Sequence, residues 1–277
     1  VYSSGNSPLR PLSSLSSALA QSRPLYQAGP LAVRPHLSYE IVTGTGILRI
    51  PGSTEKVTMH TLSPGVALEL GTRITADYTL SRLMYSDSQF SDATNHNARI
   101  QGGIVRDTLK LNFSGGYGSN STVLVETGGQ TEEDSYSAGT NIAYQLGQRT
   151  ELELNLSMSD RSAKPVAGAV TWNASDYTLW NASLWLRRHV SQDLSFAAGY
   201  TAGYDEIDPG PDMSHGTPQV QVTWTPIKKI SLNAEYGIER RRTRTSRAET
   251  QSNARYSGSL IYEPFPTTTV SVGVSRS

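Results

Sequence analysis

Residues 150–159 read TELELNLSMS, and polar and apolar side chains alternate along the whole stretch. Leucine and methionine occupy the even positions from 152 to 158, whereas glutamate, asparagine and serine occupy all five odd ones. Successive side chains of a β-strand point to opposite sides, so this pattern predicts a strand with one apolar and one polar face. The run exceeds the globular mode of about 5 to 6 residues and matches the roughly 9 to 11 residues of a tilted membrane-crossing strand.

This stretch is the second arm of a hairpin that recurs along the chain. Each copy has an alternating run, a short polar turn and a second alternating run. The copies are ALELGTRITADY (67–78), GGIVRDTLKLNF (102–113), AYQLGQRTELEL (143–154), LRRHVSQDLSFA (186–197), VTWTPIKKISLN (222–233) and IYEPFPTTTVSV (261–272). Longer polar stretches, such as SDSQFSDAT (86–94) and RTSRAETQ (244–251), separate them. Alternating short turns and long loops are typical of an up-and-down outer-membrane barrel, with short periplasmic turns and longer external loops.

The composition fits a protein with a polar interior. Apolar residues make up 36% and charged residues 17% of the 277 residues, and both fractions are below those of ordinary soluble domains. A barrel tolerates this because its apolar side faces lipid. Acidic and basic residues are equal in number, 24 of each, so net charge gives no argument for nucleic acid as a partner. A soluble β-protein, sugar-binding or adhesive, is the alternative, but its sheet needs a second apolar layer.

We expect two parts, an irregular periplasmic leader (1–32) and an all-β antiparallel transmembrane barrel of about 12 to 14 strands (33–277). The alternation places strands at 33–48, 55–70, 73–87, 94–105, 108–125, 134–146, 150–163, 173–189, 193–207, 214–226, 229–244, 252–263 and 267–277. Bacterial single-chain barrels have an even number of strands. Either one N-terminal strand is miscounted or a final strand follows Ser277, and we favour the second reading. The segment LSSLSSALAQ (12–21) suits a short helix.

Two stretches carry a family resemblance. LAVRPHLSYEIVTGTGI (31–47) resembles the opening strand of bacterial outer-membrane β-barrel porin families, and HTLSPGVALELGTRITADYTLSRLMYSDS (60–88) resembles their repeating strand–turn–strand unit. The resemblance covers roughly residues 31–277. It implies an outer-membrane channel, and some members of these families accompany polysaccharide synthesis or export.

The polar phase of the strands predicts the residues that line the lumen. Both charge signs occur among them, together with amides. They include Asp77, Arg99, Lys110, Asn141, Glu151, Glu153, Arg187, Gln221, Glu235 and Arg255. Rings of one sign would predict ion selectivity, and this mixture does not. Glu151 and Glu153 lie two residues apart. We interpret this pair as part of the hydrated lumen wall and not as a hydrolytic site.

The most basic segment is GIERRRTRTSRAET (237–250). We expect it in an external loop, where its arginines would bind lipopolysaccharide phosphates, since guanidinium groups match phosphate geometry. These arginines are Arg240, Arg241, Arg242, Arg244 and Arg247. Outer-membrane lipid, lipopolysaccharide and other envelope proteins are therefore the expected partners.

No catalytic, cofactor or metal site is predicted. The five histidines show no metal-ligand spacing, and no nucleotide or nucleophile motif occurs. The first hypothesis is a porin-like channel of the outer membrane for small polar solutes or a glycan. The alternative is a structural barrel that anchors a surface or polysaccharide-export complex.

Overall fold

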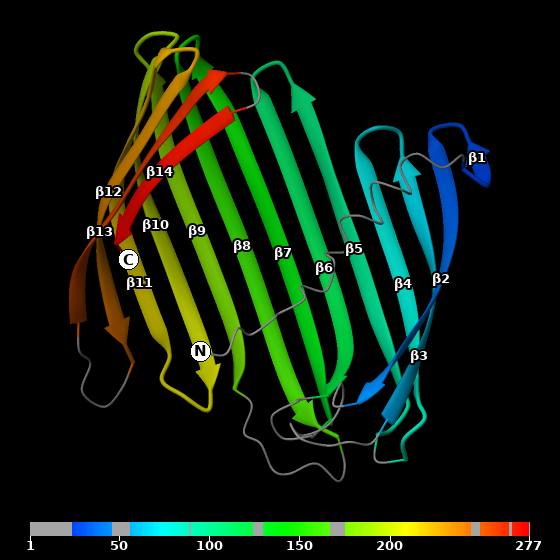
Figure 1. The fold of residues 1–277 in the computed structure, drawn as a ribbon. Helices are drawn as coiled ribbons and strands as arrows, with labels where there is room; N and C mark the ends of the chain where they lie inside the picture. The colour runs from blue at the N-terminus through cyan, green and yellow to red at the C-terminus, as the bar shows by residue number, and fades with distance from the viewer. Residues whose placement is uncertain are drawn as a thin grey trace.

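The computed structural model describes residues 24–45, 56–88, 90–123, 130–166, 175–244, 250–265 and 268–276. These residues form one 14-stranded sheet in which neighbours along the chain are neighbours in space. All recorded pairings are antiparallel. Figure 1 shows this meander as long strands running side by side from β1 to β14. The predicted all-β up-and-down architecture is confirmed.

The strands are long and regular. They are β1 (Tyr26–Ala28), β2 (Leu31–Thr45), β3 (Lys56–Leu70), β4 (Ile74–Tyr85), β5 (Ala93–Arg106), β6 (Leu109–Val123), β7 (Gln130–Gly147), β8 (Thr150–Pro165), β9 (Asp176–His189), β10 (Leu194–Asp208), β11 (Met213–Ile227), β12 (Ile230–Thr243), β13 (Thr250–Phe265) and β14 (Thr268–Arg276). Except for β1, the paired strands provide most backbone amides with partners from a neighbouring strand, which a lipid-exposed backbone requires.

The pairing register gives the sheet one polar and one apolar face. Asn141 lies opposite Asn155, and Asn155 lies opposite Ser183, so polar residues stay on the same side from strand to strand. We call this side the polar face. The other, apolar face carries large exposed side chains from β2 to β14, among them Leu37, Tyr78, Ile100, Leu156, Leu184, Val220, Tyr236 and Val272. A sheet without a covering layer exposes such side chains only where another apolar phase meets them.

Short connections lie at one end of the sheet and longer ones at the other. Residues 71–73, 107–108, 148–149, 190–193 and 228–229 join strands at what we call the turn end. The φ of Gly71 is 59°, a left-handed conformation that glycine adopts without steric cost. At the opposite end, which we call the loop end, six to ten residues separate consecutive strands, except for the four residues 209–212 between β10 and β11. This alternation is the one predicted from the recurring hairpin.

The N-terminal boundary differs from the prediction. β1 and the first residues of β2 lie within the segment expected to be irregular, so the structure adds one short strand to the thirteen predicted ones. β1 makes only three pairings with β2, and a strand this short shows no alternation in the sequence. The expected helix at 12–21 lies outside the described residues.

Among the described residues, no pairing joins β14 to β1 or β2. These described strands therefore form the two edges of the sheet, β1 paired only with β2 and β14 only with β13. In the same part of the chain, no helix has the length and apolar content to cross a membrane.

Candidate functional site: the polar face

The polar face brings the ten predicted wall residues onto one side of the sheet. Asp77 lies opposite Arg99. The pairing register from strand to strand places the other members on the same side of the sheet. The members of this set are Asp77, Arg99, Lys110, Asn141, Glu151, Glu153, Arg187, Gln221, Glu235 and Arg255. The strand pairing alone shows that these ten side chains share one face of the sheet. That it encloses a water-filled lumen stays a prediction.

The polar face is concave, because side chains on it meet across an intervening strand. His36 Nε2 of β2 lies 3.2 Å from Asp77 Oδ2 of β4, over Gly65 of β3. Arg187 of β9 donates to Gln221 Oε1 of β11 at 3.2 Å, across Ala197, which is 4% exposed. A small residue in the middle strand leaves room for the longer neighbours to converge.

Arg187 also forms an ion pair with Glu153. Its Nε donates to Glu153 Oε1 at 3.0 Å, and both side chains are about three-quarters buried, with 21% and 24% exposed. Glu151, and not Glu153, is the register partner of Arg187, so the arginine bends diagonally along the face. Two of the predicted wall charges therefore neutralise each other.

Further ion pairs on this face were not selected from the sequence. Arg34 pairs with Glu69 at 3.0 Å, and Arg161 donates to Glu133 Oε2 at 2.6 Å. Each of these four residues lies at a polar position in the alternation of its strand. The alternation could therefore have placed them on the polar face. Which charges meet depends on the register between strands, which alternation within one strand does not give.

The centre of the face is uncharged and hollowed. Asn141 Nδ2 donates to Asn155 Oδ1, and Asn155 Nδ2 donates to Ser183 Oγ at 3.2 Å. A hollow of about 630 Å³ lies over this region, and its lining includes Thr75, Gln101, Asn112, Ser114, Gly139, Asn141, Asn155 and Ser157, with the charged Arg73 at its turn-end margin. An amide ladder over three strands fixes the side chains and leaves hydroxyls and amides facing the hollow.

The arginine-rich segment follows the predicted strand 229–244 and not the loop assignment. Arg240, Arg241 and Arg242 belong to β12, because the strand continues to Thr243. Arg241 lies on the polar face and donates to Glu239 Oε1 at 2.8 Å. Arg240 and Arg242 have the opposite phase and lie on the apolar face at the loop end. Arg244 directly follows the strand.

Glu239, at the base of this segment, has a side chain only 7% exposed, and Arg255 Nη1 lies 3.7 Å from its Oε2. The predicted wall residue Arg255 thus joins the same cluster as Arg241. Arg247 lies outside the described residues.

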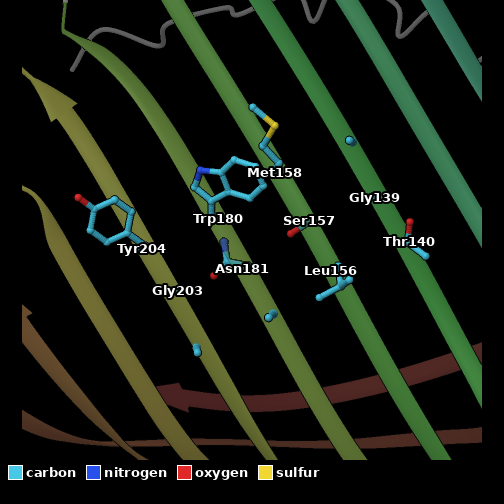
Figure 2. Close-up of a pocket in the computed structure, with 12 residues that line it drawn as sticks. Gly139, Thr140, Leu156, Ser157, Met158, Trp180, Asn181, Gly203 and Tyr204 are labelled. Atoms are coloured by element: carbon cyan, nitrogen blue, oxygen red, sulfur yellow. The ribbon is translucent and has the colours of Figure 1, made fainter.

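The apolar face has its own hollow, of about 430 Å³, over β7 to β10 (Figure 2). Leu156, Met158, Trp180 and Tyr204 surround it, with Ala138, Ala182 and Ala202 also in the lining. Figure 2 shows the Trp180 indole beside the Met158 side chain. Small side chains between large ones make this surface uneven, as suits contact with flexible acyl chains.

Aromatic rings collect at both ends of the apolar face. Tyr144, Trp224 and Tyr262 are exposed near the turn end. Trp180 and Tyr204 lie towards the loop end, whereas the Tyr117–Tyr136 pair, with ring centroids 4.9 Å apart, lies nearer the middle of its strands. Such belts sit at the two interfaces of a membrane barrel.

The histidines form no joint site. His60 Nδ1 lies 2.7 Å from the Tyr39 hydroxyl, and His96 Nδ1 lies 2.8 Å from the Tyr78 hydroxyl, both on the apolar face. His215 lies on the polar face beside Gly203. Within the described ranges, no three metal-ligating side chains gather in one place.

No family model matches this sequence, and no curated protein matches it. Solved structures do share its fold. The FrpB iron transporter from Neisseria meningitidis (F3-3 variant) matches with a TM-score of 0.57 and 12% identity, over 86% of this chain and 52% of that one. The unliganded ferric citrate transporter FecA matches with a TM-score of 0.53 and 10% identity, over 88% and 44%. The copper transporter OprC matches with a TM-score of 0.50 and 12% identity, over 91% and 46%.

These structures are outer-membrane barrels, and the chain therefore has an outer-membrane barrel fold. The chain spans about half the length of the transporters it matches. Identities this low show the fold alone. The resemblance to the porin families stays a prediction, since no family model matches.

Proposed function

We propose that this chain forms the wall of an outer-membrane channel through which small polar solutes or a glycan diffuse. The observation that carries the proposal is the concave polar face, continuous across the strands and backed by an apolar face. A curved sheet of this kind, set in a bilayer, presents lipid with its apolar side and water with its polar side.

The charges on the polar face favour a channel of weak ion selectivity. Glu153 pairs with Arg187, and Glu133 pairs with Arg161, so much of the wall charge is compensated locally. Ion selectivity needs a ring of one sign. We therefore expect cations and anions to permeate at comparable rates.

Cysteine accessibility in planar bilayers tests the channel. The chain contains no cysteine, so Ser157→Cys on the polar face and Leu156→Cys on the apolar face give single, adjacent probes. We expect steady ion conductance, lowered by a charged methanethiosulfonate reagent for Ser157→Cys only. The Leu156→Cys protein is the matched control.

A folded barrel without conductance would contradict the proposal, as would equal modification of both cysteines. If such a barrel retained an envelope protein in mild detergent, an anchoring function would replace the channel.

We further propose that Arg240 and Arg242 bind phosphates of outer-leaflet lipopolysaccharide. Both are exposed on the apolar face at the loop end, the end that is external in barrels of this type. A basic side chain near an anionic membrane surface contributes about 1 kcal/mol. Arg240→Gln/Arg242→Gln should therefore weaken lipopolysaccharide binding, measured by co-migration in detergent, whereas Arg241→Gln on the polar face should not. Equal loss in both variants would contradict this site.

A further inference from the structure

The centre of the polar face carries two neighbouring rows without any charged residue from β5 to β10. One row consists of Gly103, Asn112, Asn141, Asn155, Ser183 and Thr201. The next row consists of Gln101, Ser114, Gly139, Ser157, Asn181 and Gly203. We call these two rows the amide–hydroxyl band. Every position in it is an amide, a hydroxyl or a glycine.

Charged residues begin immediately beside the band. The adjoining row towards the turn end contains Lys110 and Glu153, and the one towards the loop end contains Arg99 and Asp205. The hollow of about 630 Å³ lies over the band from β5 to β8, and Arg73 lines it at the edge next to Gly103. The band is therefore recessed over these strands, with one cationic residue at the margin of the hollow.

The band suits a ligand with many hydroxyl groups and no charge. An amide offers two N–H donors and a carbonyl acceptor, and a Ser or Thr hydroxyl both donates and accepts. Neighbouring hydroxyls of a sugar also donate and accept, so the two surfaces satisfy each other. An ionic solute would lose hydration over the band, where none of the twelve positions supplies an opposite charge.

Trp185 supplies the apolar part of such a site. It lies in β9 between Ser183 and Arg187, and all three side chains are on the polar face. Its indole covers Gly199, since a Cβ built on Gly199 would fall 2.5 Å from Trp185 Cδ2. The other tryptophans in the described segments, Trp180 and Trp224, are exposed on the apolar face. An aromatic face carries partial negative charge and attracts the C–H groups on the flat side of a pyranose.

We propose that the amide–hydroxyl band and Trp185 form a binding track for an uncharged oligosaccharide. This inference rests on the proposed channel function, because the track lies on the face assigned to the lumen. The sugar hydroxyls bond to the band, and one ring stacks on Trp185. At the border towards the turn end, Glu153 is paired with Arg187, so its charge is compensated beside the track.

Isothermal titration of the detergent-solubilised protein tests the track independently of conductance. The probes are maltohexaose, cellohexaose, isomaltohexaose and chitohexaose, with hexagalacturonate as the charged counterpart. We expect at least one neutral hexasaccharide to bind, and hexagalacturonate to bind at least tenfold more weakly. Asn155→Asp, which adds a charge with little change in shape, and Trp185→Leu should each weaken the neutral ligand at least tenfold. Ser259→Asp, on the polar face of β13 outside the band, should leave binding unchanged.

The bilayer assay separates the two proposals. If ions pass but no neutral saccharide binds or blocks the current, the track is wrong and the channel stands. If saccharide binds to a barrel that conducts no ions, the channel is wrong and the track is a binding site only. Equal or tighter binding of hexagalacturonate overturns the track, and so does a binding loss in Ser259→Asp as large as in Asn155→Asp.

Discussion

Leu156 and Ser157 are neighbours in β8, but they lie in opposite surroundings. The leucine is 45% exposed on a face of exposed leucines, tyrosines and tryptophans. The serine lies on a face of amides, hydroxyls and paired charges. Because the backbone pairing is the same for both, the difference comes from the face alone. On the apolar face, solubility in lipid determines which side chains are stable. On the polar face, the available hydrogen-bonding partners determine this.

A charge introduced on each face gives the largest expected contrast. Leu156→Arg lies near the middle of β8, and an arginine at the bilayer midplane costs about 2 to 4 kcal/mol. Ser157→Arg, on the polar face, should cost under about 1 kcal/mol, because the guanidinium stays in water. Urea unfolding of the protein in lipid vesicles measures both free energies of unfolding. Similar losses in the two variants would mean that the faces do not differ in this way.

A smaller effect is expected for charge pairs, and it depends on burial. A double-mutant cycle with Glu153→Gln and Arg187→Gln should give a coupling free energy of about 1 kcal/mol. Arg82 and Asp92 lie 3.6 Å apart at the loop end and are 47% and 44% exposed. Their coupling should be only about 0.2 kcal/mol, because solvent screens exposed pairs. If the coupling free energy of Arg82 with Asp92 equalled that of Glu153 with Arg187, burial would not explain the strength of the ion pairs.

The smallest effect concerns ion selectivity. Glu153→Gln leaves the positive charge of Arg187 uncompensated on the polar face. A unit charge about 10 Å from a permeating ion changes its energy by about 0.4 kcal/mol in water, lowering it for anions and raising it for cations, so the anion-to-cation permeability ratio should rise roughly fourfold. The reversal potential in a salt gradient measures this ratio, and Glu153→Gln/Arg187→Gln should restore the original value. An unchanged ratio in Glu153→Gln would place these residues outside the ion path.

The predictions from the sequence succeeded where alternation was strict. Each of the long strands from β2 to β14 was predicted within a few residues, because a period of two marks both the strand and its faces. The same period placed Glu151 and Glu153 on one side of β8, as the register has them. β1 was missed because three residues do not make a period. The arginines of β12 received two conflicting predictions, the strand 229–244 and an external loop, and the pairing of β12 with β13 shows that the strand prediction was right for Arg240 to Arg242.

The meander, the alternation of turns and loops, and the phase of each strand could be predicted from the chain, since these depend on neighbouring residues only. Which side chains meet depends on how the strands pair. Arg187 pairs with Glu153 and not with its register partner Glu151, and His36 reaches Asp77 across a whole strand. The stagger between strands and the curvature of the sheet set these distances, and both arise from hydrogen bonding between segments that are far apart in the chain.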